Sequence, residues 1–405
     1  MVGITGSRRA KRLLVLGAGP AQLGLLRAAR DSGLFVIACD RDPAALGFEF
    51  ADRRAVLSNE DEPAIGMLAA AEEVDGVIAP GIDWPVAIAA RIAARFGLPH
   101  PISPETAALA VSKLRQRERL AEHGVPQPRW RVVNHEADDL ELPCAVKPPD
   151  RQGQKGLSLV HERAQLAEAI ASAVSVSRSG VALVEEFVAG PEVTVNAFST
   201  GGEFHPLTVT DRLTADPPAF GVALAHAWPS AHDVEGAIAV AREAAAALGI
   251  EDGPSYTQVL LSPDGAKVME VAARLGGGHD AELCQAALGV DLNGLALAAA
   301  LGDPVSVPSA RPVGGACVRF LVASPGLLTA AEGIERALAV EGVLDARVYR
   351  RPGWIFTPLR RGADRAGFVL ATGHSRDDAL SRADRAADLI RFSTAEIADA
   401  ISAER

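Results

Sequence analysis

Apolar runs and amphipathic stretches alternate along the first hundred residues. An apolar run at residues 12–17 is followed by a helical pattern to about Ser32 and by a second apolar run at 35–39. Continuous apolar runs of this kind are typical of buried parallel strands. The pattern continues with short strands at 55–57 and 76–79 and with helices at 62–72 and 84–96. This repeated strand–helix order predicts an α/β fold that begins with a doubly wound parallel sheet.

The order becomes less regular in the rest of the chain. A single helix is predicted from Ser103 to Gly124, because a capping residue begins the pattern and a glycine ends it. A hairpin is predicted further on, where alternating residues at 258–261 and 267–271 flank a Ser-Pro-Asp-Gly turn. Other strands are expected near 131–133, 142–147, 181–188, 190–198, 316–321, 345–349 and 368–372, and helices at 330–337 and 376–391.

Composition and charge exclude several classes of protein. A chain of 405 residues is expected to form about two to three domains. The net charge of −11 and the lack of a basic cluster argue against nucleic-acid binding. The first apolar run is too short to span a membrane, so we expect no membrane association. The four cysteines, Cys39, Cys144, Cys284 and Cys317, lack metal-site spacing and are predicted to be buried thiols in a reducing cytoplasm.

Two loops at the carboxyl ends of the first strands could hold a ligand. The turn from Gly17 to Gly24, with Asp40 after the second strand, partly matches a dinucleotide fingerprint. Its last glycine comes two residues late, so a structural turn or a site for part of a substrate remains the alternative. The loop that ends at Asp83 is either a ligand loop or the N-cap of the helix that Pro85 begins.

Charged residues cluster at the ends of strands in the middle of the chain. Lys147 ends one strand and precedes a loop with Gly153 and Gly156, which could fold over polyphosphate or be a solvated hairpin tip. Glu185 and Glu186 end another strand, and Gly-Pro-Glu192 follows. These carboxylates need partners unless they lie at an exposed edge.

The hairpin brings an amide, a carboxylate and a guanidinium together. Gln258 can face Glu270 on the opposite strand, and Arg274 lies four residues beyond that glutamate. Carboxylate and amide oxygens suit Mg²⁺ shared with nucleotide phosphates, whereas arginine suits a carboxylate or phosphate. A surface hairpin with one Glu–Arg ion pair is the alternative.

In this order, the motifs resemble those of the ATP-grasp superfamily, and specifically its carboxylate–amine ligases, which include amino-acid and dipeptide ligases. The resemblance covers the whole chain. It implies a Rossmann-like pre-ATP-grasp domain at residues 1–105 and an ATP-grasp domain at 106–314, with a lid at about 128–187. A small C-terminal α/β subdomain would follow at 315–405.

The resemblance also implies a nucleotide site. The phosphates of ATP would be held by Lys113, Lys147 and the lid-loop residues Gly153, Lys155 and Gly156. Adenine would meet Glu185, Glu186 and Val188, and the ribose would meet Glu192. Mg²⁺, or alternatively Mn²⁺, would be bound by Gln258 and Glu270. A third ligand, often Asn in the family, is replaced by Ala272, so water completes the metal shell or metal affinity is reduced.

The implied reaction is the formation of an amide from a carboxylate and an amine. The carboxylate of an amino acid or small acid would attack ATP to give ADP and an acyl phosphate, and the amine would then displace phosphate. Arg274, Lys147 and Lys155 would be catalytic. Bicarbonate-dependent carboxylation and a non-catalytic ATP-binding module are the alternatives. Partners would be these small molecules, and a homodimer remains open.

Further substrate contacts are expected beyond the hairpin. Gly276, Gly277 and His279 follow Arg274, although His279 could instead cap the next helix. Residues 211–232 contain prolines and lack a clear period, so we expect them to wall the acceptor pocket, with Arg212 and His226 as candidates. Arg319 either reaches the site or forms a surface salt bridge.

Overall fold

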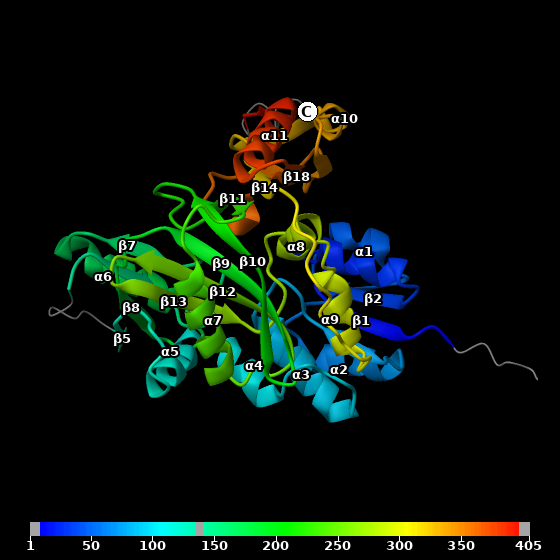
Figure 1. The fold of residues 1–405 in the computed structure, drawn as a ribbon, viewed down its shortest axis with the longest axis horizontal. Coiled ribbons are helices and arrows are strands. Elements are labelled where there is room, and N and C mark those ends of the chain that lie inside the picture. The colour runs from blue at the N-terminus through cyan, green and yellow to red at the C-terminus, as the bar shows by residue number, and fades with distance from the viewer. Residues whose placement is uncertain (1–8, 135–140, 397–405) are drawn as a thin grey trace, which may run out of the picture.

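The computed structural model describes residues 9–134 and 141–396. Figure 1 shows the N-terminal sheet on one side, the small sheet formed by β5 to β8 on the other, and a long sheet between them that continues into the C-terminal part. The expected α/β architecture is confirmed. The division at residues 105 and 314 stays a proposal, since the C-terminal strands join the central sheet.

The N-terminal sheet is entirely parallel, with strand order β3-β2-β1-β4. Its strands are β1 (Arg12–Leu16), β2 (Phe35–Asp40), β3 (Arg53–Val56) and β4 (Gly76–Ile78). Its helices are α1 (Leu23–Asp31), α2 (Glu62–Ala71) and α3 (Trp84–Phe96). Buried residues of β1 alternate between two core clusters, which explains why the whole run is apolar.

The glycine turn after β1 is filled by the chain itself. The backbone N–H of Ala18 donates to Oδ2 of Asp40 (2.9 Å), and that of Gly19 donates to Oε1 of Gln22 (2.9 Å). Gln22 is buried and its Nε2 donates to the carbonyl of Pro80 (2.7 Å). Because the donors that a pyrophosphate would need are already used, the structural turn is favoured over a dinucleotide site.

The single helix predicted from Ser103 to Gly124 is wrong, because two helices occupy this segment. They are α4 (Pro104–Ala110) and α5 (Lys113–Glu122). The break occurs at Ser112, whose extended backbone and side-chain oxygen cap the second helix at the N–H of Arg115. Serine at this position competes with helix continuation and begins a new helix. This break places Lys113 at the first position of α5.

A four-stranded antiparallel sheet and one helix form the small outer body of the molecule. The strand order is β5-β8-β6-β7, and α6 (Arg163–Val176) packs on this sheet. The strands are β5 (Trp130–Val133), β6 (Cys144–Lys147), β7 (Ser158–Val160) and β8 (Ala182–Glu186). Lys147 and Glu185 therefore stand on adjacent strands.

The central sheet has eight antiparallel strands in the order β13-β12-β9-β10-β11-β14-β18-β16. Its first five strands are β9 (Glu192–Thr200), β10 (Glu203–Thr214), β11 (Ala223–Trp228), β12 (Gly253–Ser262) and β13 (Gly265–Ala272). The predicted hairpin is confirmed as β12 and β13. Residues 211–232 are partly regular, since the end of β10 and all of β11 form a second hairpin around an irregular loop at 215–222. Helix α7 (Glu235–Ala247) covers one face, and α8 (Asp280–Leu288) and α9 (Leu292–Ala300) follow the β12–β13 hairpin.

The C-terminal part completes this sheet and adds a small one. Strands β14 (Gly315–Leu321), β16 (Val343–Val348) and β18 (Gly367–Gly373) continue the central sheet, with α11 (Arg376–Leu389) packed on them. Strands β15 (Gly326–Glu332), β17 (Ile355–Phe356) and β19 (Arg391–Ala395) form the separate sheet, and α10 (Ile334–Leu338) packs against β16 and α11. The predicted helix at 330–337 is thus partly wrong, because its first residues belong to β15.

Two further expectations can be compared with the structure. All four cysteines are free and buried, as predicted. Across residues 9–134 and 141–396, none of the helices combines the length and apolar character needed to cross a bilayer.

Candidate functional site

One face of the central sheet is polar. Residues paired directly across antiparallel strands share a face, and these pairings place Thr194, Asn196, Arg212, Tyr256, Gln258 and Glu270 on the same side. The intervening residues, such as Val193 and Val259, pack against the helix α7 on the other side. Thr194 Oγ1 and Asn196 Oδ1 are buried without a hydrogen-bond partner in the described chain. Such orphaned groups are rare, which marks this face as a candidate ligand site.

The hairpin presents two oxygen donors side by side. Gln258 stands opposite Glu270 in the β12–β13 register, as predicted. Nε2 of Gln258 donates to the hydroxyl of Tyr256 (3.0 Å), so the amide nitrogen is used and its oxygen is left for a ligand. Tyr256 stands opposite Ala272, which contributes no donor of its own.

Lys113 neutralises the glutamate of this hairpin. Its Nζ lies 2.8 Å from Oε1 of Glu270 and donates to the carbonyl of Arg151 (2.8 Å). Burial alone would raise the pKa of Glu270, but Lys113, together with Lys147 and Arg274, holds that pKa below its ordinary value. Burial would likewise lower the pKa of Lys113, yet Glu270 raises it overall. Both groups are therefore charged at neutral pH.

A second ion-pair cluster joins α5 to the small outer sheet. Oε1 of Glu185 lies 2.7 Å from Nε of Arg117, and Oε2 lies 2.7 Å from Nζ of Lys147. Burial would raise the pKa of Glu185, but Arg117 and Lys147 lower it to about 2. Burial lowers the pKa of Lys147, and Glu185 only partly offsets this.

The role of Arg117 was missed by the sequence analysis. Its guanidinium is buried and also donates to the carbonyls of Val268 (3.1 Å) and Met269 (2.6 Å) on β13. One signal was available, because Arg117 follows Lys113 by four residues and so shares its helix face. The cluster fixes β13 and α5 relative to each other.

The residues predicted to meet adenine have protein partners. Both carboxylate oxygens of Glu185 are engaged in ion pairs, so this residue orients Lys147 rather than presenting a free carboxylate. Oε2 of Glu186 lies 2.6 Å from Arg129, and Oε1 lies 2.8 Å from Lys267. Val188 is buried. An adenine contact through the backbone of Glu186 and Val188 stays a prediction.

Glu192 is tied to the arginine of the neighbouring strand. Nε of Arg212 lies 2.9 Å from Oε1 of Glu192, and Nη1 of Arg212 donates to the hydroxyl of Tyr256 (2.8 Å). The guanidinium also reaches the carbonyl of Gly221 (3.0 Å) in the β10–β11 turn. Burial would lower the pKa of Arg212, but Glu192 raises it, which keeps this residue charged. The predicted candidates Glu192 and Arg212 thus belong to one network.

Arg274 connects the hairpin to the N-terminal domain. Its Nε lies 2.7 Å from Oδ1 of Asp83, and Nη2 contacts the same oxygen. Asp83 begins α3 without capping it through its side chain, so the predicted N-cap function is not observed. Its backbone N–H donates to Oε1 of Gln152 in the lid loop (2.7 Å). Asp83 is thus the point where three parts of the chain meet.

The glycines after Arg274 are needed for close packing. A Cβ on Gly277 would lie 2.7 Å from the carbonyl of Gly81, and one on Gly276 would overlap the carboxylate of Asp280. The glycine run therefore lets the hairpin approach the N-terminal domain. A substrate contact of Gly276 and Gly277 stays a prediction.

The lid loop also has the expected glycine conformations. Gly153 and Gly156 have φ of 66° and 75°, which L side chains rarely adopt. The side chain of Lys155 is exposed and has no ion pair with any residue in the described ranges. Its proposed contact with phosphate stays a prediction.

His226 and Asp280 form a buried pair at the end of the polar face. Nδ1 of His226 lies 3.2 Å from Oδ1 of Asp280. Oδ2 of that carboxylate accepts the backbone N–H of Gly278 (2.9 Å). Burial would raise the pKa of Asp280, but His226 and these hydrogen bonds lower it well below its ordinary value. The sequence patterns indicated His279 as a candidate but gave no signal for its neighbour Asp280.

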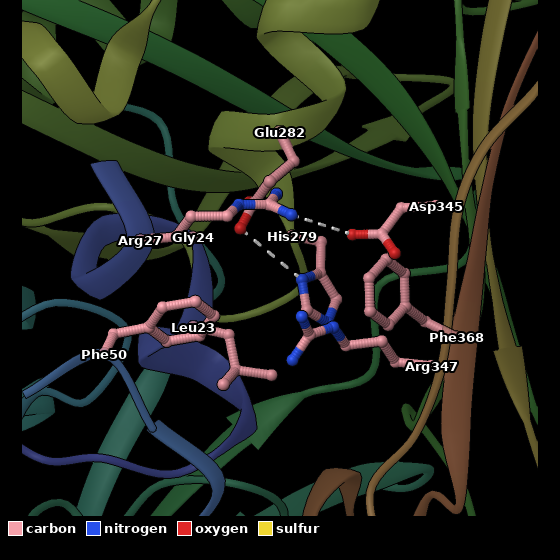
Figure 2. Close-up of a pocket in the computed structure, with 9 residues that line it drawn as sticks. All are labelled: Leu23, Gly24, Arg27, Phe50, His279, Glu282, Asp345, Arg347 and Phe368. Atoms are coloured by element: carbon pink, nitrogen blue, oxygen red, sulfur yellow. Dashed lines mark hydrogen bonds and ion pairs between the residues drawn. The ribbon is translucent and has the colours of Figure 1, made fainter. Parts of the chain in front are cut away.

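His279 lies on the other side of this turn, in the small pocket of Figure 2. Its Nδ1 is 3.6 Å from Oε1 of Glu282, and its Nε2 is 2.6 Å from the hydroxyl of Tyr349. The ring stacks on Phe368, with 3.7 Å between centroids. His279 occupies the N-cap position of α8, but its side chain makes no cap hydrogen bond. The pocket also brings Gly24 of α1 against Glu282.

Arg319 points away from this site. Val318, the next residue of β14, is paired with His226, so the side chain of Arg319 projects from the opposite face of the sheet. There, Nε of Arg319 lies 3.1 Å from Oδ1 of Asp384 on α11, and the side chain is partly exposed. The surface salt bridge is therefore the reading that the structure supports, and a substrate contact is not.

The oxygen atoms of Gln258 and Glu270 suit a metal ion that is shared with a bound phosphate, rather than one held by protein side chains alone. In the described part of the chain, no three His, Cys, Asp or Glu side chains converge as a metal site. Gln258 and Glu270 supply two oxygens, which suits Mg²⁺ because it keeps several waters and takes phosphate oxygens as further ligands. Lys113 and Lys147 stand next to this pair and could carry phosphate charge.

Two family descriptions match the chain. Residues 110–278 match "ATP-grasp domain", and residues 319–395 match "L-amino acid ligase C-terminal domain 2". The first range contains both lysines, the lid loop and the whole hairpin.

Two relatives are similar to the chain over most of its length. An uncharacterized protein of Sinorhizobium fredii is 32% identical over 76% of this chain, and the match spans 66% of that protein, so about a third of its length lies outside. A formate-dependent phosphoribosylglycinamide formyltransferase of Burkholderia lata is 28% identical over 96% of this chain and 97% of its own length.

Solved structures share the fold. An L-amino acid ligase from Bacillus licheniformis aligns with a TM-score of 0.81 and 22% identity, over 96% of this chain and all of that chain. A phosphoribosylglycinamide synthetase from Anaerococcus prevotii aligns with a TM-score of 0.77 and 19% identity, over 95% of this chain and 100% of that chain.

Proposed function

Because this chain belongs to the ATP-grasp superfamily, we propose that it is an ATP-dependent carboxylate–amine ligase that forms an amide and releases ADP and phosphate. The acyl substrate would be an amino acid or a small carboxylic acid. The observation that carries the proposal is the convergence of Lys113, Glu270, Gln258 and Arg274 at one hairpin. The match to an L-amino acid ligase C-terminal domain supports an amine acceptor.

In this proposal, bound Mg²⁺–ATP supplies an electrophilic γ-phosphate to the substrate carboxylate, which becomes an acyl phosphate. Lys113 and Lys147 neutralise phosphate charge, and Glu270 and Gln258 hold the metal. Arg274 orients the reacting carboxylate, which replaces Asp83 as its partner or shares it. The chain provides no covalent nucleophile in this scheme, so its contribution is positioning and electrostatics.

An isotope experiment tests the acyl phosphate directly. Amino-acid pairs are screened for ADP release, and the active carboxylate is then supplied with ¹⁸O in its carboxyl group. Transfer of one ¹⁸O to inorganic phosphate is expected, because the carboxylate oxygen that attacks ATP leaves with the phosphate. Formation of AMP and pyrophosphate, or phosphate without label, would overturn the mechanism.

The same screen separates the other candidates. ADP release that needs bicarbonate but no carboxylic acid would favour carboxylation, which the fold neighbours biotin carboxylase and N5-carboxyaminoimidazole ribonucleotide synthetase keep open. Tight ATP binding without turnover on any pair would instead favour a non-catalytic module, in line with Ala272. An Arg274→Met variant should lose turnover, while Arg319→Met, on the opposite sheet face, should retain it.

A further inference from the structure

The small outer body, made of β5 to β8 and α6, contacts the N-terminal domain at two consecutive residues. Oε1 of Gln152 in the lid loop accepts the backbone N–H of Asp83 (2.7 Å). The guanidinium of Arg178, in the loop between α6 and β8, lies over the indole ring of Trp84, with 3.6 Å between Cζ and the ring centroid. Asp83 and Trp84 stand at the start of α3, so two segments of the outer body meet the same point.

Asp150 joins these two segments of the outer body. Its carboxylate accepts the backbone N–H groups of Arg178 (2.9 Å) and Ser179 (2.7 Å), which fixes the loop after α6 beside the residue where the lid loop begins. Gln152 follows two positions later. The lid loop and Arg178 are therefore held together as one unit.

The contact of Arg178 with Trp84 is well shielded from water. Nη2 of Arg178 also lies 2.6 Å from Oε2 of Glu60, but the side chain of Glu60 is half-exposed, and ion pairs of exposed groups contribute little. The side chain of Arg178 is only 22% exposed, and Trp84 packs against the core beneath it. Cation–π contacts are stronger when they are desolvated, so the indole ring is the main anchor of Arg178.

The outer body has a hydrophobic core of its own. Its buried residues, among them Cys144, Val160, Leu166 and Ile170, form a cluster separate from the two clusters that contain the residues of β1. The outer body can therefore keep its fold when its contacts with the N-terminal domain break. A small number of contacts between two such bodies decides between a closed and an open arrangement.

We propose that Trp84 and Arg178 are positioning residues that latch the outer body closed over the acyl phosphate. The proposal rests on the proposed function and deepens it, because it names the contact that keeps water away from the intermediate. Asp83, next to Trp84, also holds Arg274, so the latch lies beside the residue that orients the reacting carboxylate. Water that reaches the acyl phosphate regenerates the carboxylate and releases phosphate, and ATP is then consumed without formation of an amide.

The ratio of ADP to amide measures how well the latch excludes water. The full chain is supplied with ATP, Mg²⁺ and the active substrate pair. Arg178→Met and Trp84→Leu should each raise the ratio about twofold to tenfold, as expected for the loss of one cation–π contact. Arg178→Lys keeps the cation and Trp84→Phe keeps an aromatic ring, so both should restore part of the coupling. Phe96→Leu, at the other end of α3, changes a ring that Arg95 covers at 5.4 Å and should leave the ratio unchanged.

A second measurement does not require turnover. A protease that cleaves only after lysine is added in the presence of ADP and Mg²⁺. Cleavage after Lys155, an exposed residue of the lid loop, measures how often the outer body opens, because Gln152 holds this loop in the closed form. Arg178→Met should accelerate this cleavage by about twofold to tenfold, and adding Trp84→Leu should accelerate it no further, since the two residues form one contact.

Unchanged cleavage in both single variants would overturn the proposal, and so would a double variant in which the two effects add. A ratio of ADP to amide that stays at the wild-type value although cleavage is faster would also overturn it, because the latch would then not exclude water. If Trp84 merely packed α3, its loss would lower the melting temperature and leave cleavage after Lys155 unchanged. Failure of the proposed function has a different signature, which is the absence of amide from any pair in the wild type. Faster cleavage in both variants would then still establish the contact of Arg178 with Trp84 as the latch.

Discussion

Nζ of Lys113, at the first position of α5, lies 2.8 Å from Oε1 of Glu270 on β13. The pair closes one end of the polar face. Burial raises the pKa of the glutamate, but Lys113, together with Lys147 and Arg274, brings that pKa below its ordinary value, so the glutamate is ionised. An ionised Glu270 can offer an oxygen to a metal while it remains bound to Lys113. The geometry thus links a helix start that depends on Ser112 to the chemistry of a distant hairpin.

Replacing Glu270 by Gln should remove most ATP turnover. The variant keeps the shape of the side chain but loses the charge that binds metal and neutralises Lys113. We expect a loss of about 10² to 10³ in the rate of ADP release, which is typical for the removal of one electrostatic group from an active site. The control is Glu332→Gln, an exposed residue of β15. A Glu270→Gln variant with full activity would contradict the assigned metal site.

Replacing Arg117 by Met should destabilise the fold strongly. The change leaves Glu185 buried beside a single lysine and removes donors from two carbonyls of β13. Loss of one partner of a buried ion pair costs about 3–5 kcal/mol in the free energy of unfolding. Urea titration measures this, provided that unfolding has one transition. Lys11→Met breaks a half-exposed pair with Asp303, and it should cost no more than ~1 kcal/mol. Equal losses in the free energy of unfolding of the two variants would show that the cluster of Arg117, Glu185 and Lys147 contributes no more to stability than an exposed ion pair.

Much of the arrangement could be predicted from the sequence, and the remainder depended on contacts between distant segments. The register of Gln258 and Glu270 follows from alternation and a tight turn, which are local signals. The Asp83–Arg274 pair joins residues 191 positions apart, so no local pattern indicates it. The break at Ser112 was hidden because the residues on both sides form helix equally well, and only the cap geometry separates them.

The interaction partners of individual residues also changed the roles that the sequence suggested for them. The resemblance implied an adenine contact for Glu185, and the two cations that surround its carboxylate cannot be predicted from the order of the strands. For Arg319, alternation along β14 decides the question only once the pairing with β11 is known. The sequence therefore indicated which segments come together at the polar face, and it indicated less well which partners each side chain contacts there.

The decrease in the free energy of unfolding at low pH should depend on Glu185. Its folded-state pKa is about 2, compared with an ordinary value of 4.5, so the ionised carboxylate stabilises the fold above about pH 4.5. This stabilisation is lost as the pH falls from about 4.5 to 2, because the unfolded chain takes up a proton there before the folded one. Near pH 3, the slope contributed by this group is ~1.4 kcal/mol per pH unit.

Urea titrations of the wild type and Glu185→Gln between pH 5 and 3 measure this slope. The variant should be less stable at pH 7 and should lose less stability on acidification. Glu186→Gln should also reduce the loss of stability at low pH, because burial raises the pKa of Glu186 but Lys267 and Arg129 together lower it to about 2. Curves that stay parallel in both variants would refute the assigned ion pairs.

Replacing Gly24 by Ala should destabilise the protein although alanine favours helices. Gly24 is the second residue of α1 in the pocket of Figure 2, where a Cβ would overlap Oε1 of Glu282 and lie 3.1 Å from Nδ2 of Asn293. The carboxylate is held beside His279 and cannot move without losing that partner. Overpacking of this kind costs about 1–3 kcal/mol in the free energy of unfolding.

Gly236→Ala is the matched control, because Gly236 is the second residue of α7 and its Cβ would only touch Ala266 at 3.5 Å. That change should stabilise the protein by about 0.5–1 kcal/mol through helix propensity. A double change of Gly24→Ala with Glu282→Ala should recover most of the loss caused by overlap. If the loss in the free energy of unfolding of the double variant equals the sum of the losses of the two single variants, Gly24 is not required to make space for Glu282. If the double variant regains stability, the position of Gly24 is explained. This glycine lies two residues beyond the position of the last glycine of the dinucleotide fingerprint because it allows the N-terminal domain to pack closely against α8.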